Sequence, residues 1–235
     1  MPAEHDIDIV VKNAFFAESK PGVFVEVGAA RPDYLSISES FRKQGWKIIA
    51  IEPNPEFCAA HRAQGHEVLQ YACSDVDADD VPFYVVNSKE ADYMGGKVSY
   101  ESFSSLGIRD DFAELHKTVS TDTNMISVKV RKLDTILAMH EPELTTFDML
   151  AVDVEGWELS VLRGLSIARF RPKVVILENL FKDTAYEKAM REREYRLWRT
   201  LEPNEIYVSA ACLMSPAERN PGGWRIFSRL FQSRL

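Results

Sequence analysis

Residues 23–30, VFVEVGAA, and residues 48–54, IIAIEPN, are the stretches that decide the fold. Each is a short apolar run that ends in an acidic residue and a turn, a pattern typical of a buried parallel strand. Gly28 has no side chain, so a ligand can approach the backbone closely at that point. Glu52 lies where a carboxylate can accept hydrogen bonds from both hydroxyls of a ribose. The two strands therefore predict the nucleoside-binding half of an α/β fold.

The turn after the first strand lacks the second and third glycines of the GxGxxG pattern, which binds the pyrophosphate of a dinucleotide. Their absence favours a nucleoside ligand without a phosphate, such as S-adenosylmethionine. For these two segments taken alone, the alternative is an ordinary parallel α/β sheet whose strands happen to end in acids.

Length and composition indicate one globular domain with elaborations, because the chain has 235 residues, 46% of them hydrophobic and 27% charged. No apolar run approaches the ~20 residues of a membrane-spanning helix, and the acidic start MPAEHDIDIV is unlike a signal peptide. A net charge of −8 disfavours nucleic acid as a partner. Cys58, Cys73 and Cys212 match neither a zinc pattern nor a disulfide framework, which predicts reduced thiols and a cytoplasmic protein.

Helix and strand patterns alternate over residues 1–210, which we expect to form a single α/β domain. Asp33 is expected to cap a helix over 34–44, and Asn54 followed by Pro55 to begin the next helix. Residues 88–125 are predicted to be an insertion between the third and fourth strands of the sheet. The predicted strands are 23–27, 47–52, 67–72, 81–87, 126–132, 147–152 and 173–177, with an antiparallel hairpin over 195–210 that closes the sheet.

Six segments occur in order along the chain: VEVGAA, AIEPNP, ACSD, KLDTIL, FDMLAVDVEGWELSVLRGL and VVILEN. Together they resemble the FkbM family of S-adenosylmethionine-dependent methyltransferases, and DVEGWELSVLRG with EPNP upstream is the most specific part. The resemblance implies a Rossmann-like methyltransferase fold with a mostly parallel seven-stranded sheet, and O-methylation of a sugar, glycan or other small metabolite. The first motif departs from the family pattern DVGAN, because Glu26 is one carbon longer than the usual acid and Ala30 replaces the asparagine.

Residues at the carboxyl ends of the first three strands are expected to bind S-adenosylmethionine. The first strand would contact the methionine part, the second the ribose and the third the adenine. An acid at a strand end can also hold a loop or cap a helix, which is the structural alternative for Glu26 and Asp75. The residues concerned are, in strand order, Glu26, Gly28 and Ala29, then Glu52 and Pro53, then Ser74 and Asp75.

Asp153 and Glu155 follow the fourth strand, at the sheet edge where open α/β sheets bind ligands. A hydroxyl is a poor nucleophile until its proton is removed, and a carboxylate within reach can take that proton. We expect Asp153 to face the cofactor and act as the base, and Glu155 either to assist or to hold the turn. Trp157 is expected to pack or to line the acceptor pocket. Residues 88–125 would form an acceptor-binding lid from which Ser104 and Ser105 reach the acceptor.

Glu178 and Asn179 end the fifth strand, which is predicted to lie beside the fourth. Together with Asp153 they offer the oxygen ligands that Mg²⁺ prefers. This arrangement resembles the metal site of catechol-type methyltransferases, although the FkbM resemblance itself implies no metal. Metal-free proton removal is therefore the main hypothesis, and a magnesium site formed by Asp153, Glu178 and Asn179 is the alternative.

The tail, residues 211–235, has four arginines against one acid, and its apolar residues Ile226, Phe227, Leu230 and Phe231 would lie on one face of a helix. It predicts either docking on the same domain or a second subunit, or contact with an anionic membrane surface. For the whole chain, two other functions stay open: methylation of nitrogen or carbon in another acceptor, and a non-catalytic nucleoside-binding module. The sequence does not name the acceptor.

Overall fold

A computed structural model of the chain describes residues 3–88, 91–93, 96–98, 106–107, 120–210 and 212. Its centre is a six-stranded sheet in the order β10–β11–β9–β8–β1–β2. The four strands β1, β2, β8 and β9 are parallel, and the hairpin β10–β11 adds to β9 in the antiparallel direction. The bounds are Val23–Val27 for β1, Lys47–Ile51 for β2, Met149–Val152 for β8, Val174–Glu178 for β9, Tyr195–Leu201 for β10 and Asn204–Ser209 for β11.

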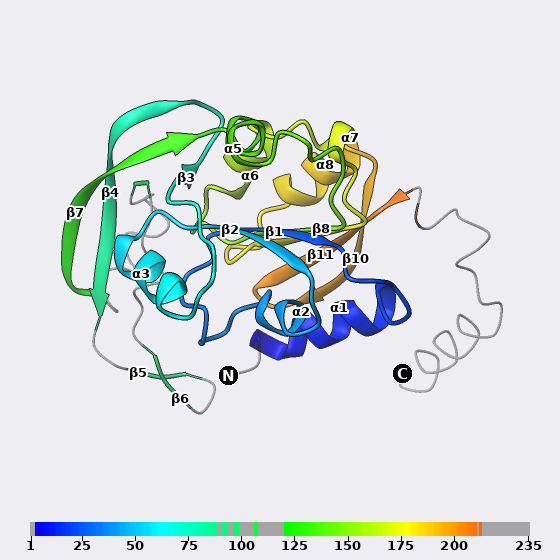
Figure 1. Cartoon of the computed structure of the whole chain (residues 1–235), viewed down its shortest axis with the longest axis horizontal. Helices are drawn as coiled ribbons and strands as arrows, with labels where there is room; N and C mark the ends of the chain where they lie inside the picture. The colour runs from blue at the N-terminus through cyan, green and yellow to red at the C-terminus, as the bar shows by residue number, and fades with distance from the viewer. Residues whose placement is uncertain are drawn as a thin grey trace.

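Helices cover both faces of this sheet (Figure 1). Because successive side chains of a strand point to opposite faces, Val25 and Val27 of β1 pack with one set of helices, and Phe24 packs with the other. Both faces of the central strands are therefore buried, which explains their nearly continuous apolar sequences. The first set is α5 (Leu133–His140), α6 (Glu158–Arg163), α7 (Ile167–Phe170) and α8 (Ala185–Glu192). The second is α1 (Ile7–Phe15), α2 (Glu39–Arg42) and α3 (Pro55–Ala63).

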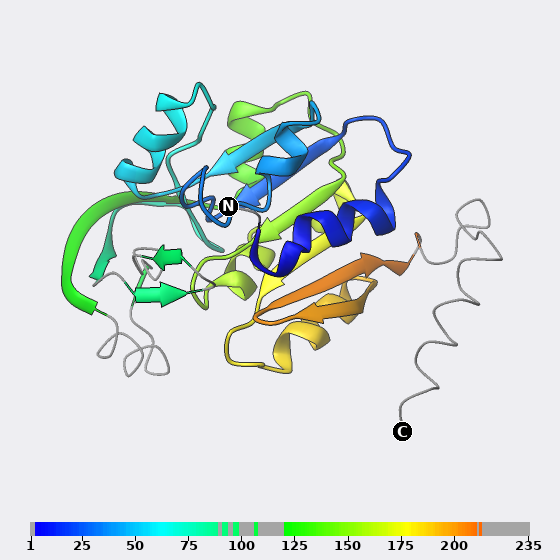
Figure 2. The ribbon, with the colours of Figure 1, turned by 90° about the horizontal axis from the view of Figure 1, so that it is seen from below.

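A second sheet of three strands curves away from one edge of the first (Figures 1 and 2). Its long strands β4 (Ala78–Ser88) and β7 (Ser120–Arg131) are antiparallel, and the short β3 (Ala72–Cys73) is parallel to β7. Between β4 and β7, strands β5 (Ala91–Tyr93) and β6 (Gly96–Val98) form a small hairpin. The insertion predicted from the sequence is thus carried by this sheet.

The mostly parallel sheet and its antiparallel hairpin agree with the sequence prediction. The predicted total of seven strands is wrong, because residues 67–72, expected as the third strand along the chain, do not form a strand of the main sheet. Only Leu69 forms a parallel bridge, with Ile51, at the edge of the main sheet. The chain then turns to the second sheet, where Ala72 and Cys73 pair with β7. Apart from Leu69, whose N–H donates to the Ala50 carbonyl and whose carbonyl accepts from the Glu52 N–H, the main sheet ends at β2.

Two predicted helix starts had different outcomes. The Asn54 side chain accepts a hydrogen bond from the Glu56 N–H at 3.0 Å, so this cap is confirmed. The helix expected over 34–44 with Asp33 as its cap is wrong, because α2 begins only at Glu39. Leu35 has a φ of 52°, a left-handed conformation that interrupts a helix at that point.

Several predictions fall on residues outside the described ranges: Ser104, Ser105 and the tail apart from Cys212. Within those ranges, no helix combines the length and the apolar character needed to cross a membrane.

Candidate active site

An open cleft of about 580 Å³ lies at the carboxyl ends of β1, β2 and β8. One wall comes from the main sheet and includes Gly28, Glu52 and Asp153. The opposite wall comes from the second sheet and the chain leading into it, and includes Tyr71 and Phe83. The cleft stands at the sheet edge where open α/β folds bind ligands.

Glu52 is buried at the end of β2, with both carboxylate oxygens held by backbone groups. Oε1 accepts a hydrogen bond from Asn54 N at 2.7 Å, and Oε2 accepts one from Ala30 N at 2.9 Å. A carboxylate oxygen has a second lone pair, so each oxygen can still accept from a ligand hydroxyl. Desolvation raises the pKa of Glu52 to about 7, against the lowering effect of the two N–H groups.

Gly28 lines the cleft and lies directly against the backbone of the loop after β8. Its φ is +81°, and a Cβ at this position would lie 1.7 Å from the carbonyl oxygen of Asp153. Only glycine fits such an approach. The N–H groups of Gly28 and of the buried Ala29 both point to the Ile51 carbonyl, at 2.9 and 3.2 Å. Pro53 also lines the cleft, whereas Ala29 lies behind it.

Glu26 does not line the cleft. It is buried, and its carboxylate accepts hydrogen bonds from the backbone N–H of Ser38 at 3.2 Å and from its hydroxyl at 2.5 Å. Desolvation raises the pKa of Glu26 to about 7, while the Ser38 bonds lower it. Glu26 therefore anchors the chain that leads into α2, and the structure matches the loop-holding alternative for this acid.

Ser74 and Asp75 also lie outside the cleft lining. The Asp75 carboxylate accepts a hydrogen bond from Arg163 Nε at 2.8 Å, and this contact lowers the pKa of Asp75. The part of the chain that does line the cleft comes just before them, at Tyr71, Ala72 and Cys73. The residues that line this part of the cleft are therefore more apolar than Ser74 and Asp75.

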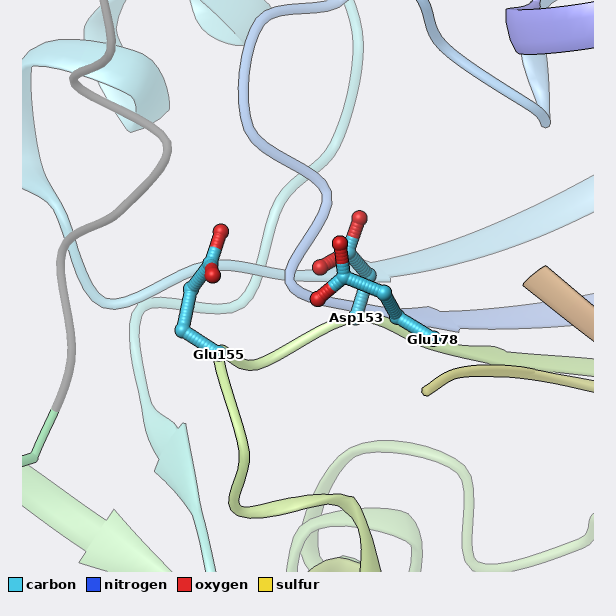
Figure 3. A group of neighbouring side chains, drawn as sticks. All are labelled: Asp153, Glu155 and Glu178. Carbon is cyan, nitrogen blue, oxygen red and sulfur yellow. The ribbon is translucent and has the colours of Figure 1, made fainter. Parts of the chain in front are cut away.

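Three carboxyl groups gather beyond the ends of β8 and β9. One oxygen from each of Asp153, Glu155 and Glu178 lies within 4.8 Å of the others, and the side chains rise on the same side of the loop (Figure 3). Glu155 is buried, Glu178 is half-buried and Asp153 is exposed to the cleft. The Asp153 and Glu178 carboxyls are close enough to affect each other's ionisation: their contact lowers the pKa of Asp153 and raises that of Glu178.

The crowding of these acids changes their ionisation. Desolvation, followed by the charge of Glu158, raises the pKa of Asp153 to about 7. Desolvation and then the charge of Asp153 raise the pKa values of Glu155 and Glu178 well above the ordinary value for a glutamate. A carboxylate with a pKa near neutrality is suited to accept a proton from a substrate.

Asn179 does not join these acids. Its Nδ2 donates to the Asp183 carbonyl at 3.1 Å and to Glu205 Oε1 at 3.0 Å, and its Oδ1 accepts from Asp183 N at 2.8 Å. The amide is thus used to hold the turn after β9 against β11. The structure brings together only two members of the predicted magnesium site, Asp153 and Glu178, and the third acid beside them is Glu155.

Glu158 organises the loop after β8, residues 153–157, which carries Asp153 and Glu155 and is called the acid-bearing loop below. The sequence reasoning missed this role. Its Oε1 accepts from Val154 N at 3.0 Å and Gly156 N at 3.1 Å, and its Oε2 accepts from the Tyr186 hydroxyl. Glu155 and Gly156 have φ values of 57° and 90°, so two successive residues are left-handed and need such support. The sequence feature that could have predicted this role is the position of Glu158 in the first turn of a helix, because glutamates there commonly accept hydrogen bonds from preceding backbone N–H groups.

Trp157 lines the cleft, and residues 106–107 of the insertion lie beside it. Leu106 is also in the lining, and a Cβ on Gly107 would lie 3.5 Å from Cζ2 of the indole. The Trp157 Nε1 is buried and has no hydrogen-bond partner among the described residues. Trp157 and Leu106 are thus both part of the cleft wall.

Comparison with known proteins gives an independent assignment. The model of the methyltransferase FkbM domain matches residues 26–197. A crystal structure of methyltransferase FkbM from Methylobacillus flagellatus KT matches with 14% identity and a TM-score of 0.48. The match covers 84% of this chain and 47% of that one, so the chain spans about half the length of this solved protein. No curated protein matches. Because the matched domain spans most of the sequence, the chain belongs to the FkbM methyltransferase family.

Proposed function

We propose that this protein transfers the methyl group of S-adenosylmethionine to a hydroxyl group of a sugar, glycan or other small metabolite. The observation that carries the proposal is the shared cleft, in which Glu52, Gly28 and Asp153 stand at the ends of three adjacent parallel strands. Membership of a methyltransferase family supports the reaction class.

The cofactor would lie across these strand ends. The ribose hydroxyls would donate to the two oxygens of Glu52, whose remaining lone pairs are not used by the backbone. The adenine would occupy the apolar wall near Tyr71 and Phe83, and the methionine part would follow the turn at Gly28. This order places the sulfonium towards Asp153.

Methyl transfer needs an acceptor oxygen in line behind the methyl group and a place for the acceptor's proton. S-adenosylmethionine, when bound, would supply a methyl carbon that bonds to the acceptor oxygen while the carbon–sulfur bond breaks and its electron pair stays on sulfur, which gives S-adenosylhomocysteine. The hydroxyl proton would pass to the Asp153 carboxylate, which lines the cleft and whose pKa is raised to about 7 by desolvation. Holding the two reactants in line supplies most of the rate gain.

Two measurements test the proposal. Isothermal titration calorimetry with S-adenosylhomocysteine should show one site per chain, and no binding would refute the cofactor assignment. A screen of nucleotide sugars, glycans and glycolipids with S-adenosylmethionine should then give one product heavier by a single CH₂ unit. Mass fragmentation that places the methyl group on nitrogen or carbon would contradict the hydroxyl acceptor, and a cofactor-binding protein without any product would be a non-catalytic module.

A further inference from the structure

We propose that Asp153, Glu155 and Glu178 bind a hard divalent cation, such as Mg²⁺, Mn²⁺ or Ca²⁺, that holds the acceptor hydroxyl at the cleft. Binding of the cation stands on the geometry of these three residues alone. Its role towards the acceptor rests on the methyltransferase function proposed above.

The state of Glu155 is the first reason. Glu155 is only 5% exposed to solvent, and its Oε2 has no hydrogen-bond partner among the described residues. A buried carboxylate oxygen without a partner is costly and therefore rare. The carboxylate rises on the same side of the loop as Asp153 and Glu178 (Figure 3), with one of its oxygens within 4.8 Å of theirs. A cation between the three groups would give the buried Glu155 carboxylate a partner.

The local charge is the second reason. Among the described residues, the strongest charge effects on Asp153, Glu155 and Glu178 come from one another and from further acids, chiefly Glu158. These neighbours are all acids, so they add to the negative charge of the site. A bound cation would offset this charge.

The donor atoms and their spacing define the class of cation. Carboxylate oxygens suit hard cations such as Ca²⁺ and Mg²⁺, which they bind at roughly 2.0–2.6 Å. Three oxygens within 4.8 Å of one another can all reach a single ion after small side-chain movements.

The cleft gives this cation a role. Of the three acids, only Asp153 lines the cleft, and the site uses one oxygen from each residue. A cation there can bind the acceptor oxygen and lower the pKa of its hydroxyl. The second oxygen of Asp153 stays free to take the proton, while the oxygen–methyl bond forms and the carbon–sulfur bond breaks.

Binding of Mn²⁺ to the full-length protein, freed of metal by chelation, is the direct test. Electron paramagnetic resonance should detect one Mn²⁺ bound per chain, displaced by Mg²⁺ or Ca²⁺. Glu155→Gln keeps the size of the side chain and should weaken Mn²⁺ binding by at least about 10-fold. Glu143→Gln is the matched control, because it removes the same charge from an exposed residue before the amino end of β8, and it should bind Mn²⁺ as the wild type does.

Absence of saturable Mn²⁺ binding would overturn the proposal, and so would wild-type affinity in a folded Glu155→Gln protein. If that variant fails to fold, as judged by circular dichroism, Asp153→Asn takes its place with the same expected loss. Titration with S-adenosylhomocysteine in the absence of metal separates the two proposals. Cofactor binding without Mn²⁺ binding refutes the cation site alone, whereas Mn²⁺ binding without cofactor binding refutes the methyltransferase function and leaves the cation site.

Discussion

Replacing Glu52 by alanine tests the proposed binding of the cofactor's ribose in the cleft. The carboxylate is fixed by the N–H groups of Asn54 and Ala30, at 2.7 and 2.9 Å, and keeps one lone pair on each oxygen for a ribose hydroxyl. A hydrogen bond to a charged group contributes about 1.5–3 kcal/mol. Loss of two such bonds predicts about 3–6 kcal/mol, which corresponds to roughly 10²- to 10⁴-fold weaker binding of S-adenosylhomocysteine.

Calorimetric titration above pH 7, where Glu52 is ionised, measures this change directly. Alanine also leaves the two N–H groups without their acceptor, so melting curves must show that the variant is folded. Glu52→Gln keeps the volume and one acceptor and should lose less stability, whereas Glu56→Ala, at an exposed position on α3, should bind normally. A folded Glu52→Ala protein with affinity within a factor of two of the wild type, about 0.4 kcal/mol, would refute the ribose assignment.

Three further predictions follow from the same loops. Gly28→Ala should lower the free energy of unfolding by more than about 3 kcal/mol, because its Cβ would meet the Asp153 carbonyl oxygen. Gly65→Ala shares a positive φ but has open space, so denaturant unfolding should show a loss of only about 1 kcal/mol, and equal losses would contradict the steric reason. For Glu26, burial raises the pKa from 4.5 to about 7, so the folded state binds more protons than the unfolded state in that window. Stability should therefore fall as pH rises from 4.5 to 7, by at most about 3 kcal/mol from this group, and Glu26→Gln should flatten the curve in denaturant titrations; parallel curves would contradict this. Asp153→Asn should lower turnover about 10²- to 10⁴-fold with nearly unchanged S-adenosylhomocysteine affinity, and near-normal turnover would exclude Asp153 as the base.

The main sheet could be predicted because its signals are local. Apolar runs bounded by glycine, proline or acids define β1 and β2 almost to the residue, and the Asn54 cap depends on contacts two residues away. Gly28, Glu52 and Asp153 were found because the ends of adjacent parallel strands meet at one sheet edge. For these residues, position at the end of a predicted strand was enough to predict that they lie at the same edge of the sheet.

What the sequence did not reveal depends on contacts between distant residues. An apolar stretch does not name its partner strand, so residues 67–72 were predicted as one strand of the main sheet, although only Leu69 bridges β2 and Ala72 pairs with β7. Likewise, nothing local indicates that the Asp75 carboxylate contacts Arg163, 88 residues away. The burial of a side chain and the direction in which it points arise only when the elements pack.

The acid-bearing loop shows the same limit over a shorter distance. Asp153, Glu155 and Glu158 lie within six residues; the sequence favours Asp153 as the acid that faces the cofactor, but it leaves two roles open for Glu155 and gives none to Glu158. The directions of Glu155 and Glu158 depend on the left-handed conformations of Glu155 and Gly156, which turn the chain. Glu158 then accepts the N–H groups of the loop, and this leaves the other two acids for Glu178.

Residues 89–119 of the insertion connect Ser88 at the end of β4 to Ser120 at the start of β7, and these two serines are paired across the two strands. Its two ends therefore meet on an arm that shares no strand with the main sheet in the described part of the chain. A segment whose ends are already close together can change in length and composition at little cost to folding. Residues 89–119 could accordingly be exchanged during evolution without disturbing the strands whose ends carry Gly28, Glu52 and Asp153.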